Sequence, residues 1–218
     1  CDGNTPDKLK FPQNLEPIKE KYELLCNTKS DINDHLPTLY KYATKCESII
    51  ELGVRSVISS YAFVYGLLNN NKLKRKLFMN DINPCNLSNI LKITENLNIH
   101  IKYQWINNLQ LGLDGNYDLT FIDTWHVYGQ LKRELNKFSK VTNKYIIMHD
   151  TTVDGELGET IRSKLDAEKQ STETGFPIDE IKKGLMPAIE EFLEINKDWI
   201  LAEKFTNNNG LTILEKKK

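Results

Sequence analysis

The segment YDLTFIDTWHVYG, residues 117–129, contains the junction on which our prediction of the fold depends. Its first six residues are mostly apolar and β-branched or aromatic, a composition typical of a buried strand. The strand pattern ends at Asp123, His126 follows three residues later, and a helical pattern begins at Tyr128. A buried strand that leads through a short polar loop into a helix is the repeating unit of an α/β protein.

Strand and helix patterns alternate along the chain on both sides of this segment. The expected strands span residues 48–52, 77–82, 99–104, 117–122, 145–148, 200–205 and 210–214, and the expected helices span about 31–45, 59–68, 86–97, 128–138 and 185–195. This alternation predicts an α/β fold with a doubly wound, mostly parallel sheet of seven strands. We expect residues 1–29 to form an N-terminal helical arm and residues 30–216 to form the functional domain.

The overall composition argues against several classes of protein. The 218 residues carry a formal net charge of -1, so no general field attracts nucleic acid or an anionic membrane. No apolar run is long enough to span a membrane. The four cysteines are scattered without a CxxC pair, which favours a reducing, cytoplasmic setting over a disulfide framework or a zinc site. Because the chain begins at Cys1, we expect an excised domain or a processed chain.

Two of the expected strands end on acidic and histidine side chains. One is followed by Asp123 and His126, and the run YIIMHD at 145–150 ends on His149 and Asp150. Doubly wound sheets bind ligands outside the carboxyl ends of their strands, where all four side chains are expected to lie. If the two carboxylates converge, they repel unless a cation lies between them, and oxygen ligands suit Mg²⁺, Mn²⁺ or Ca²⁺. The alternative is that both acids only cap strand ends.

A second group of residues predicts a nucleoside site. In IIELGVRSVISS, residues 49–60, Gly53 supplies a tight turn, Glu51 precedes it, and Ser59 begins the next helix. After the second strand, Asp81 stands where an acid can accept both hydroxyl groups of a ribose. A glycine turn after the first strand and an acid after the second are typical of an adenosine-binding α/β domain.

The glycine pattern also narrows the choice of cofactor. A dinucleotide-binding turn needs GxGxxG to approach a pyrophosphate, but Val54, Arg55, Ser56 and Val57 follow Gly53. No Walker-type GxxxxGK[ST] motif occurs anywhere in the chain. A donor without a pyrophosphate, S-adenosylmethionine, therefore fits better than NAD, and a nicotinamide-dependent dehydrogenase is the least favoured interpretation.

Together these motifs resemble those of the class I S-adenosylmethionine-dependent methyltransferases, which implies a Rossmann-like fold. The resemblance is carried by SDINDHLPTLYKYA, IIELGVRSVISS, NDINP, FIDTWHVYGQLKREL, YIIMHDTT and NNNGLTILEK, from about residue 30 to 216. The segments are most similar to metal-dependent sugar O-methyltransferases, and they also resemble methyltransferase domains of glycan-synthesis proteins from large algal viruses (chloroviruses). Arg55 and Val57 replace the later glycines of the family's E-x-G-x-G-x-G pattern, so the seat of the donor's methionine end stays open.

The resemblance implies a reaction and a set of roles. A methyl group passes from S-adenosylmethionine to a sugar hydroxyl, such as that of rhamnose or another deoxyhexose in a glycan, and leaves S-adenosylhomocysteine. The metal, Mg²⁺ or Mn²⁺, is held by Asp123, His149 and Asp150, with a shell that lacks His149 as the alternative. His126 is the candidate general base, because an imidazole suits removal of the hydroxyl proton. Apart from the resemblance, we expect Asn107 or Asn108 to border the adenine and Asp123 also to contact the donor. The resemblance further implies a sugar or glycan acceptor, a larger multidomain glycosyltransferase chain and, for a viral protein, the host-cell cytoplasm.

Several alternatives stay open at this point. The acceptor hydroxyl could belong to a non-sugar molecule such as a catechol, or the domain could be an inactive donor-binding module of a larger glycan-synthesis protein. The polar segment 151–178 is expected to be a lid over the acceptor, with an ordinary mobile loop as the alternative. The weaker candidates for a functional contact are His35, His100, Trp105, Trp125 and Asn108.

Overall fold

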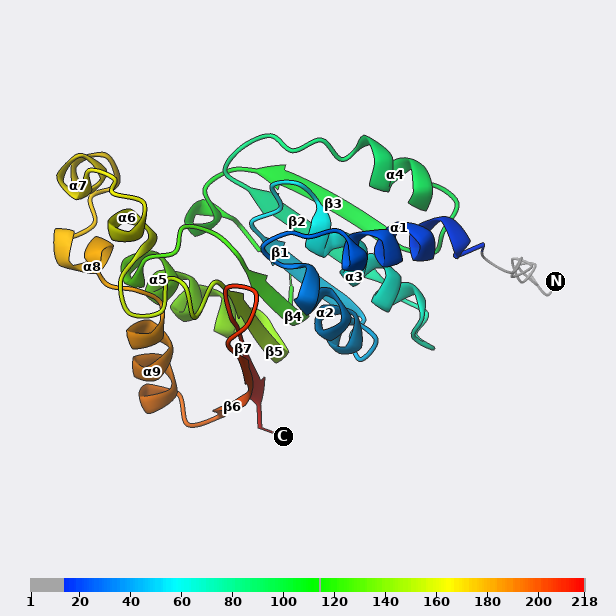
Figure 1. Cartoon of the computed structure of the whole chain (residues 1–218). Coiled ribbons are helices and arrows are strands. Elements are labelled where there is room, and N and C mark those ends of the chain that lie inside the picture. Colours follow the sequence, from blue (N-terminus) through cyan, green and yellow to red (C-terminus); the bar gives the residue numbers. More distant parts are fainter. Residues whose placement is uncertain (1–13, 114, 218) are drawn as a thin grey trace.

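A seven-stranded sheet forms the centre of the computed structural model, which describes residues 14–113 and 115–217 (Figure 1). The strands are β1 Ser48–Leu52, β2 Lys76–Asp81, β3 His100–Trp105, β4 Tyr117–Ile122, β5 Thr142–His149, β6 Trp199–Phe205 and β7 Leu211–Lys216. Their order is β3-β2-β1-β4-β5-β7-β6. The first five strands in this order are parallel, and β7 is antiparallel to both β5 and β6. The predicted mostly parallel α/β sheet is confirmed.

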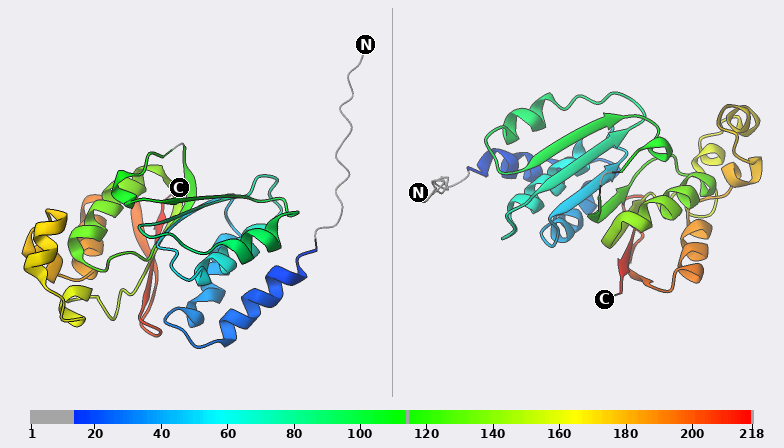
Figure 2. Two further views of the ribbon diagram at one scale, coloured as in Figure 1. Left: turned by 90° about the horizontal axis from the view of Figure 1, so that it is seen from above. Right: turned by 180° about the vertical axis from the view of Figure 1, so that it is seen from behind.

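Helices cover both faces of the sheet (Figure 2). The first face packs against α1 Glu16–Asn27, α2 Leu36–Ala43, α3 Ile58–Leu68 and α4 Ser88–Thr94, and the second against α5 Tyr128–Phe138 and α9 Met186–Ile195. Successive strand residues point to opposite faces, so Phe121 joins the first core and Ile122 the second. Both cores are closed by helices, as expected for parallel strands that are apolar on both sides. Within the described residues, no helix is long and apolar enough to cross a membrane.

The N-terminal part of the chain differs from the prediction. The expected helix over about 31–45 is wrong in its first turn, because residues 33–35 form a 3₁₀ helix and α2 begins at Leu36. Pro37 lacks a backbone N–H and is therefore accommodated in the first turn of the α-helix. Before it, α1 has twelve residues and buries Ile18 completely in the core, so the described part of the arm packs on the domain.

The segment 151–178 contains regular structure. It includes α6 Glu159–Arg162 and α7 Ala167–Thr174 and reaches the start of α8 Ile178–Lys182. These three helices lie together beyond the sheet, at the left of Figure 1. The start of the segment is tied down, since the backbone N–H groups of Thr152 and Val153 both donate to the carbonyl oxygen of Asn209. The prediction of a lid is not tested by this arrangement.

Backbone pairing brings the first and fourth strands together at their carboxyl ends. Leu52 pairs with Ile122, and the N–H of Asp123 donates to the carbonyl oxygen of Leu52 at 2.8 Å. The turn at Gly53 therefore lies directly beside Asp123. Chain order reverses here, because β1 continues to β2 on one side while β4 lies on its other side. Ligands of doubly wound sheets bind at such a switch point.

Candidate functional site

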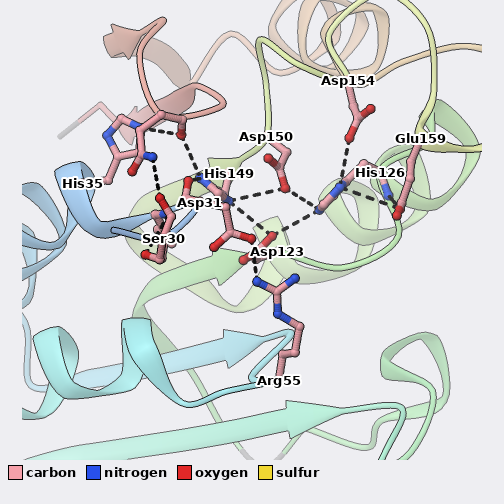
Figure 3. A network of polar contacts seen from close by, with 12 residues as sticks. Ser30, Asp31, His35, Arg55, Asp123, His126, His149, Asp150, Asp154 and Glu159 are labelled. Carbon is pink, nitrogen blue, oxygen red and sulfur yellow. Dashed lines mark hydrogen bonds and ion pairs between the residues drawn. The ribbon is translucent and has the colours of Figure 1, made fainter. Parts of the chain in front are cut away.

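A compact group of acidic and imidazole side chains lies at the carboxyl ends of β4 and β5 (Figure 3). Nε2 of His126 is 3.1 Å from Oδ1 of Asp123 and 3.2 Å from Oδ2 of Asp150. Asp123, His126 and Asp150 each offer one ligand atom, and these atoms lie within 4.8 Å of one another. The predicted convergence of the two carboxylates is confirmed, although their predicted roles are not tested by proximity.

The other ring nitrogen of His126 faces the segment that follows β5. Nδ1 lies 3.1 Å from Oδ2 of Asp154, whose side chain is completely buried. Asp154 in turn accepts two hydrogen bonds from Arg162, at 2.5 Å from Nε and 2.9 Å from Nη2. A second carboxylate, that of Glu159, lies 3.8 Å from Nδ1. The sequence marked Asp154 only as a polar residue of the lid, since nothing local connects it with His126.

His149 is oriented from two distant parts of the chain. Nε2 lies 3.1 Å from the backbone oxygen of Asp31 and 3.2 Å from that of Asn208, so this nitrogen carries a proton and donates. Nδ1 faces the acids, 3.5 Å from Oδ1 of Asp123 and 3.4 Å from Oδ2 of Asp150. It has no hydrogen-bond partner among the described residues, although His149 is almost fully buried.

Contacts within this group of side chains shift the pKa values of Asp123, His126 and His149. Burial opposes ionisation of Asp123, but the hydrogen bond from His126 and the facing His149 imidazole outweigh it and lower the pKa of this carboxyl. Burial also opposes protonation of His126, yet its hydrogen bonds to Asp123 and Asp154 raise its pKa well above the ordinary value. For His149 burial is likewise outweighed by the two facing carboxylates, which raise its pKa to about 10. Both histidines are therefore protonated near neutral pH, and their positive charges pair with the surrounding carboxylates.

The donor atoms of this cluster fit a divalent cation. Nδ1 of His149 and Oδ1 of Asp150 are buried without hydrogen-bond partners among the described residues. A histidine that donates its outer N–H to a carbonyl and turns its other nitrogen toward carboxylates has the orientation of a metal-ligating imidazole. Two carboxylates with imidazole suit Mn²⁺, and the oxygens alone suit Mg²⁺. His126 was expected outside the ligand set, but its Nε2 lies as near to both acids as His149 does.

The predicted donor-binding residues surround the turn after β1. Asp81 ends β2, and its Oδ2 accepts the N–H groups of Val54 and Arg55, each at 2.9 Å. Burial opposes its ionisation, but these N–H groups and that of Asn83 lower the pKa of Asp81, so it stays a carboxylate. Asp81 therefore fixes the turn at Gly53, and the contact of this loop with a donor stays a prediction.

Glu51 and Ser59 interact with each other. The Glu51 carboxylate is completely buried and accepts hydrogen bonds from Ser59 at 2.5 Å and Ser60 at 2.7 Å. This contact ties the end of β1 to the first turn of α3. Burial raises the pKa of Glu51 to about 8. Their predicted contact with the donor stays a prediction.

The loop after β3 is braced by α5. Asn107 accepts the N–H of Leu109, and the side chain of Asn108 donates to the buried Glu134. Lys137 donates to the carbonyl oxygens of residues 108, 109 and 111. The loop is thus held rigidly beside the ends of β2 and β3, although contact of Asn107 with adenine is still a prediction.

The weaker candidates occupy different environments. His35 is buried, donates toward the carbonyl oxygens of Asn207 and Asn208, and meets the ring of His149 edge-on at 5.8 Å. His100 begins β3, at the opposite end of the sheet from the cluster. Trp105 is 65% exposed at the end of β3. Trp125 lies in the His126 loop and stacks on Phe176 at 5.9 Å.

The chain is similar to known proteins in its three-dimensional structure and not in its sequence. No protein-family model matches the chain, and no curated protein sequence matches it. Among solved structures, an O-methyltransferase from Bacillus cereus in complex with S-adenosylhomocysteine has a TM-score of 0.57 at 12% identity, covering 96% of this chain and 94% of that one. TomG from Streptomyces achromogenes, an O-methyltransferase involved in tomaymycin synthesis and solved with S-adenosylmethionine, has a TM-score of 0.57 at 11% identity, covering 96% and 93%.

A third similar structure is the N-methyltransferase NodS from Bradyrhizobium japonicum. Its TM-score is 0.55 at 11% identity, with coverage of 86% of this chain and 97% of that one. The chain has a Rossmann-like methyltransferase fold. In this methyltransferase fold the Gly53 turn and the cluster of Asp123, His126 and Asp150 lie at neighbouring strand ends.

Proposed function

We propose that this protein is an S-adenosylmethionine-dependent O-methyltransferase that methylates a sugar hydroxyl with the help of a divalent cation. One observation carries the proposal. An imidazole between two carboxylates, those of Asp123 and Asp150, lies at the strand end adjoining the Gly53 turn. This arrangement supports proton removal by His126 next to the expected donor loop.

The residues supply most of what such a transfer needs. Methyl transfer from a sulfonium is a one-step in-line displacement, so alignment of donor and acceptor contributes strongly to the rate. The Gly53 turn and Asp81 hold the donor, and the acceptor hydroxyl approaches from the side of the cluster. His126, kept in one orientation by Asp154, removes the hydroxyl proton, a role that contributes about 10²–10⁴-fold.

Asp123, His149 and Asp150 would hold the cation. When bound, a divalent cation lowers the pKa of a coordinated hydroxyl and fixes its position. Metal binding to an imidazole releases its proton, which would leave His149 neutral despite the surrounding acids. The nearby positive charge of the cation would also oppose protonation of His126. A neutral His126 is the form that can accept the proton.

A sugar acceptor agrees with the surroundings of the cluster. Trp125 and Phe176 form an aromatic pair next to His126, and Arg133 lies 4.0 Å above the ring of Phe176. Aromatic rings with neighbouring polar groups suit a ligand that presents both C–H faces and hydroxyls. The carboxylate of Glu159 adds a hydrogen-bond acceptor on the same side.

The test is calorimetry followed by an activity screen. We expect the wild-type protein to bind S-adenosylmethionine and not NAD, and to methylate one member of a panel of nucleotide sugars and glycan fragments. Excess chelator should abolish turnover, and Mg²⁺ or Mn²⁺ should restore it. Binding of NAD without S-adenosylmethionine would overturn the proposal, while turnover of catechols alone would move the acceptor to another class.

A further inference from the structure

Two residues in the turn after β1 adopt the left-handed backbone conformation that favours glycine, although neither is a glycine. Arg55 has φ 41° and Val57 has φ 64°, both in the left-handed region. For a residue with a side chain this conformation is strained, whereas glycine adopts it freely. The protein therefore retains Arg55 at a position where glycine would be more stable.

Stability does not explain this choice. The Arg55 side chain is 73% exposed and makes one ion pair, 2.5 Å from Nη2 to Oδ2 of Asp31. Exposed ion pairs contribute little to stability, so this pair does not offset the strain. The hydrogen bond from the Arg55 N–H to Asp81 is a backbone contact that glycine would also make. Backbone strain of this kind is typical of functional positions.

The ion pair lies between the donor turn and the acidic cluster. Figure 3 shows the guanidinium group of Arg55 pointing from the turn toward Asp31 and Asp123. Asp31 is itself fixed, since its backbone oxygen accepts from His149. The neighbouring Ser30 oxygen accepts from the side chain of Asn208 at 2.9 Å. One cation and one anion are thus held side by side at the edge of the proposed donor site.

We propose that Arg55 and Asp31 form a clamp for the α-amino-acid end of the donor, with Arg55 binding its carboxylate and Asp31 its ammonium group. The inference rests on the proposed function and identifies the residues that bind the methionine end of the donor. A zwitterionic group matches a paired cation and anion in charge, and guanidinium binds carboxylate through two parallel hydrogen bonds. The adenosine end is left to the loop shaped by Asp81 and Gly53.

Calorimetry with two ligands isolates this end of the donor. S-adenosylhomocysteine carries the amino-acid group, and 5′-methylthioadenosine lacks it. Arg55→Gly removes the guanidinium while suiting the left-handed backbone, so the variant should fold at least as well as the wild type. We expect its affinity for S-adenosylhomocysteine to fall about 10- to 100-fold and its affinity for 5′-methylthioadenosine to stay unchanged.

A charge swap separates a ligand clamp from a structural ion pair. Asp31→Arg combined with Arg55→Asp keeps the two charges paired but exchanges their places, so affinity for S-adenosylhomocysteine should stay low. Lys41→Ala, which breaks the distant ion pair with Glu203, is the control and should bind both ligands normally. Wild-type affinity in Arg55→Gly, or recovery in the charge swap, would overturn the clamp.

The wild-type protein distinguishes this inference from the proposed function. If it binds both ligands with equal affinity, the clamp is overturned while adenosine recognition stands. If it binds neither ligand, the proposed function fails and the clamp fails with it. Tighter binding of S-adenosylhomocysteine than of 5′-methylthioadenosine, lost in Arg55→Gly, supports both.

Discussion

The α-carbon of Gly53 packs so closely on Asp123 that a β-carbon at residue 53 would lie 1.7 Å from the backbone oxygen of Asp123. Gly53 also has φ 87°, which disfavours any other residue. The expected donor turn and the first acid of the cluster are therefore one packed unit. A side chain added at residue 53 would displace the backbone of Asp123.

The first prediction concerns this contact. Gly53→Ala should lower the free energy of unfolding by about 2–4 kcal/mol, because the new methyl group meets backbone that must shift and the left-handed φ is strained. Urea denaturation measures this difference. Gly112→Ala, where a β-carbon would meet no atom within 4 Å, is the matched control and should change stability little. Equal effects of the two substitutions would show that the contact is unimportant.

The second prediction concerns the orientation of His126. Asp154→Asn keeps the size of the side chain but removes the carboxylate that accepts from Nδ1. Turnover should fall about 10- to 100-fold, the usual effect of losing such a supporting partner, while donor affinity should stay close to wild type. In His126→Ala, turnover should fall about 10²–10⁴-fold. Single-turnover rates and donor calorimetry measure both effects, and a wild-type rate in Asp154→Asn would remove Asp154 from this role.

The third prediction concerns the cation. Asp150→Asn preserves shape but removes one charge facing both histidines, so it should weaken binding of Mn²⁺ measured by calorimetry. Donor affinity should be nearly unchanged, since Asp150 lies outside the residues proposed to bind the donor. Lys41→Ala again serves as a control far from the site. An unchanged Mn²⁺ affinity in Asp150→Asn, or full wild-type activity in excess chelator, would contradict metal binding by this cluster.

The fourth prediction concerns pH. Burial raises the pKa of Glu51 to about 8 from an ordinary value of 4.5, so the folded protein keeps a proton that the unfolded chain releases. This contribution to stability is fully present below pH 4.5 and is lost as the pH rises through 8. Glu51→Gln cannot ionise and should therefore gain stability relative to the wild type between pH 5 and 8. Urea unfolding at several pH values tests this, and parallel curves would contradict it.

Local sequence patterns determined the framework of this protein. The strands at 48–52 and 117–122 and the helix at 128–138 were predicted with their observed bounds, because apolar periodicity is a local property of the chain. The same patterns placed Asp123 and Asp150 at strand ends, and parallel strands bring such ends to one edge of a sheet. The sequence alone therefore predicted that Asp123, His126, His149 and Asp150 lie at the same edge of the sheet.

Only the tertiary structure decided how those residues are held. Asp154 reaches His126 across 28 residues of chain, and His149 is oriented by the carbonyl oxygens of Asp31 and Asn208 from opposite ends of the domain. Arg55 looked like a mere departure from a glycine pattern until its left-handed backbone and its partner Asp31 were seen. These contacts depend on how loops pack after the sheet forms. No local periodicity encodes them, because each joins groups whose distance is set by the whole fold.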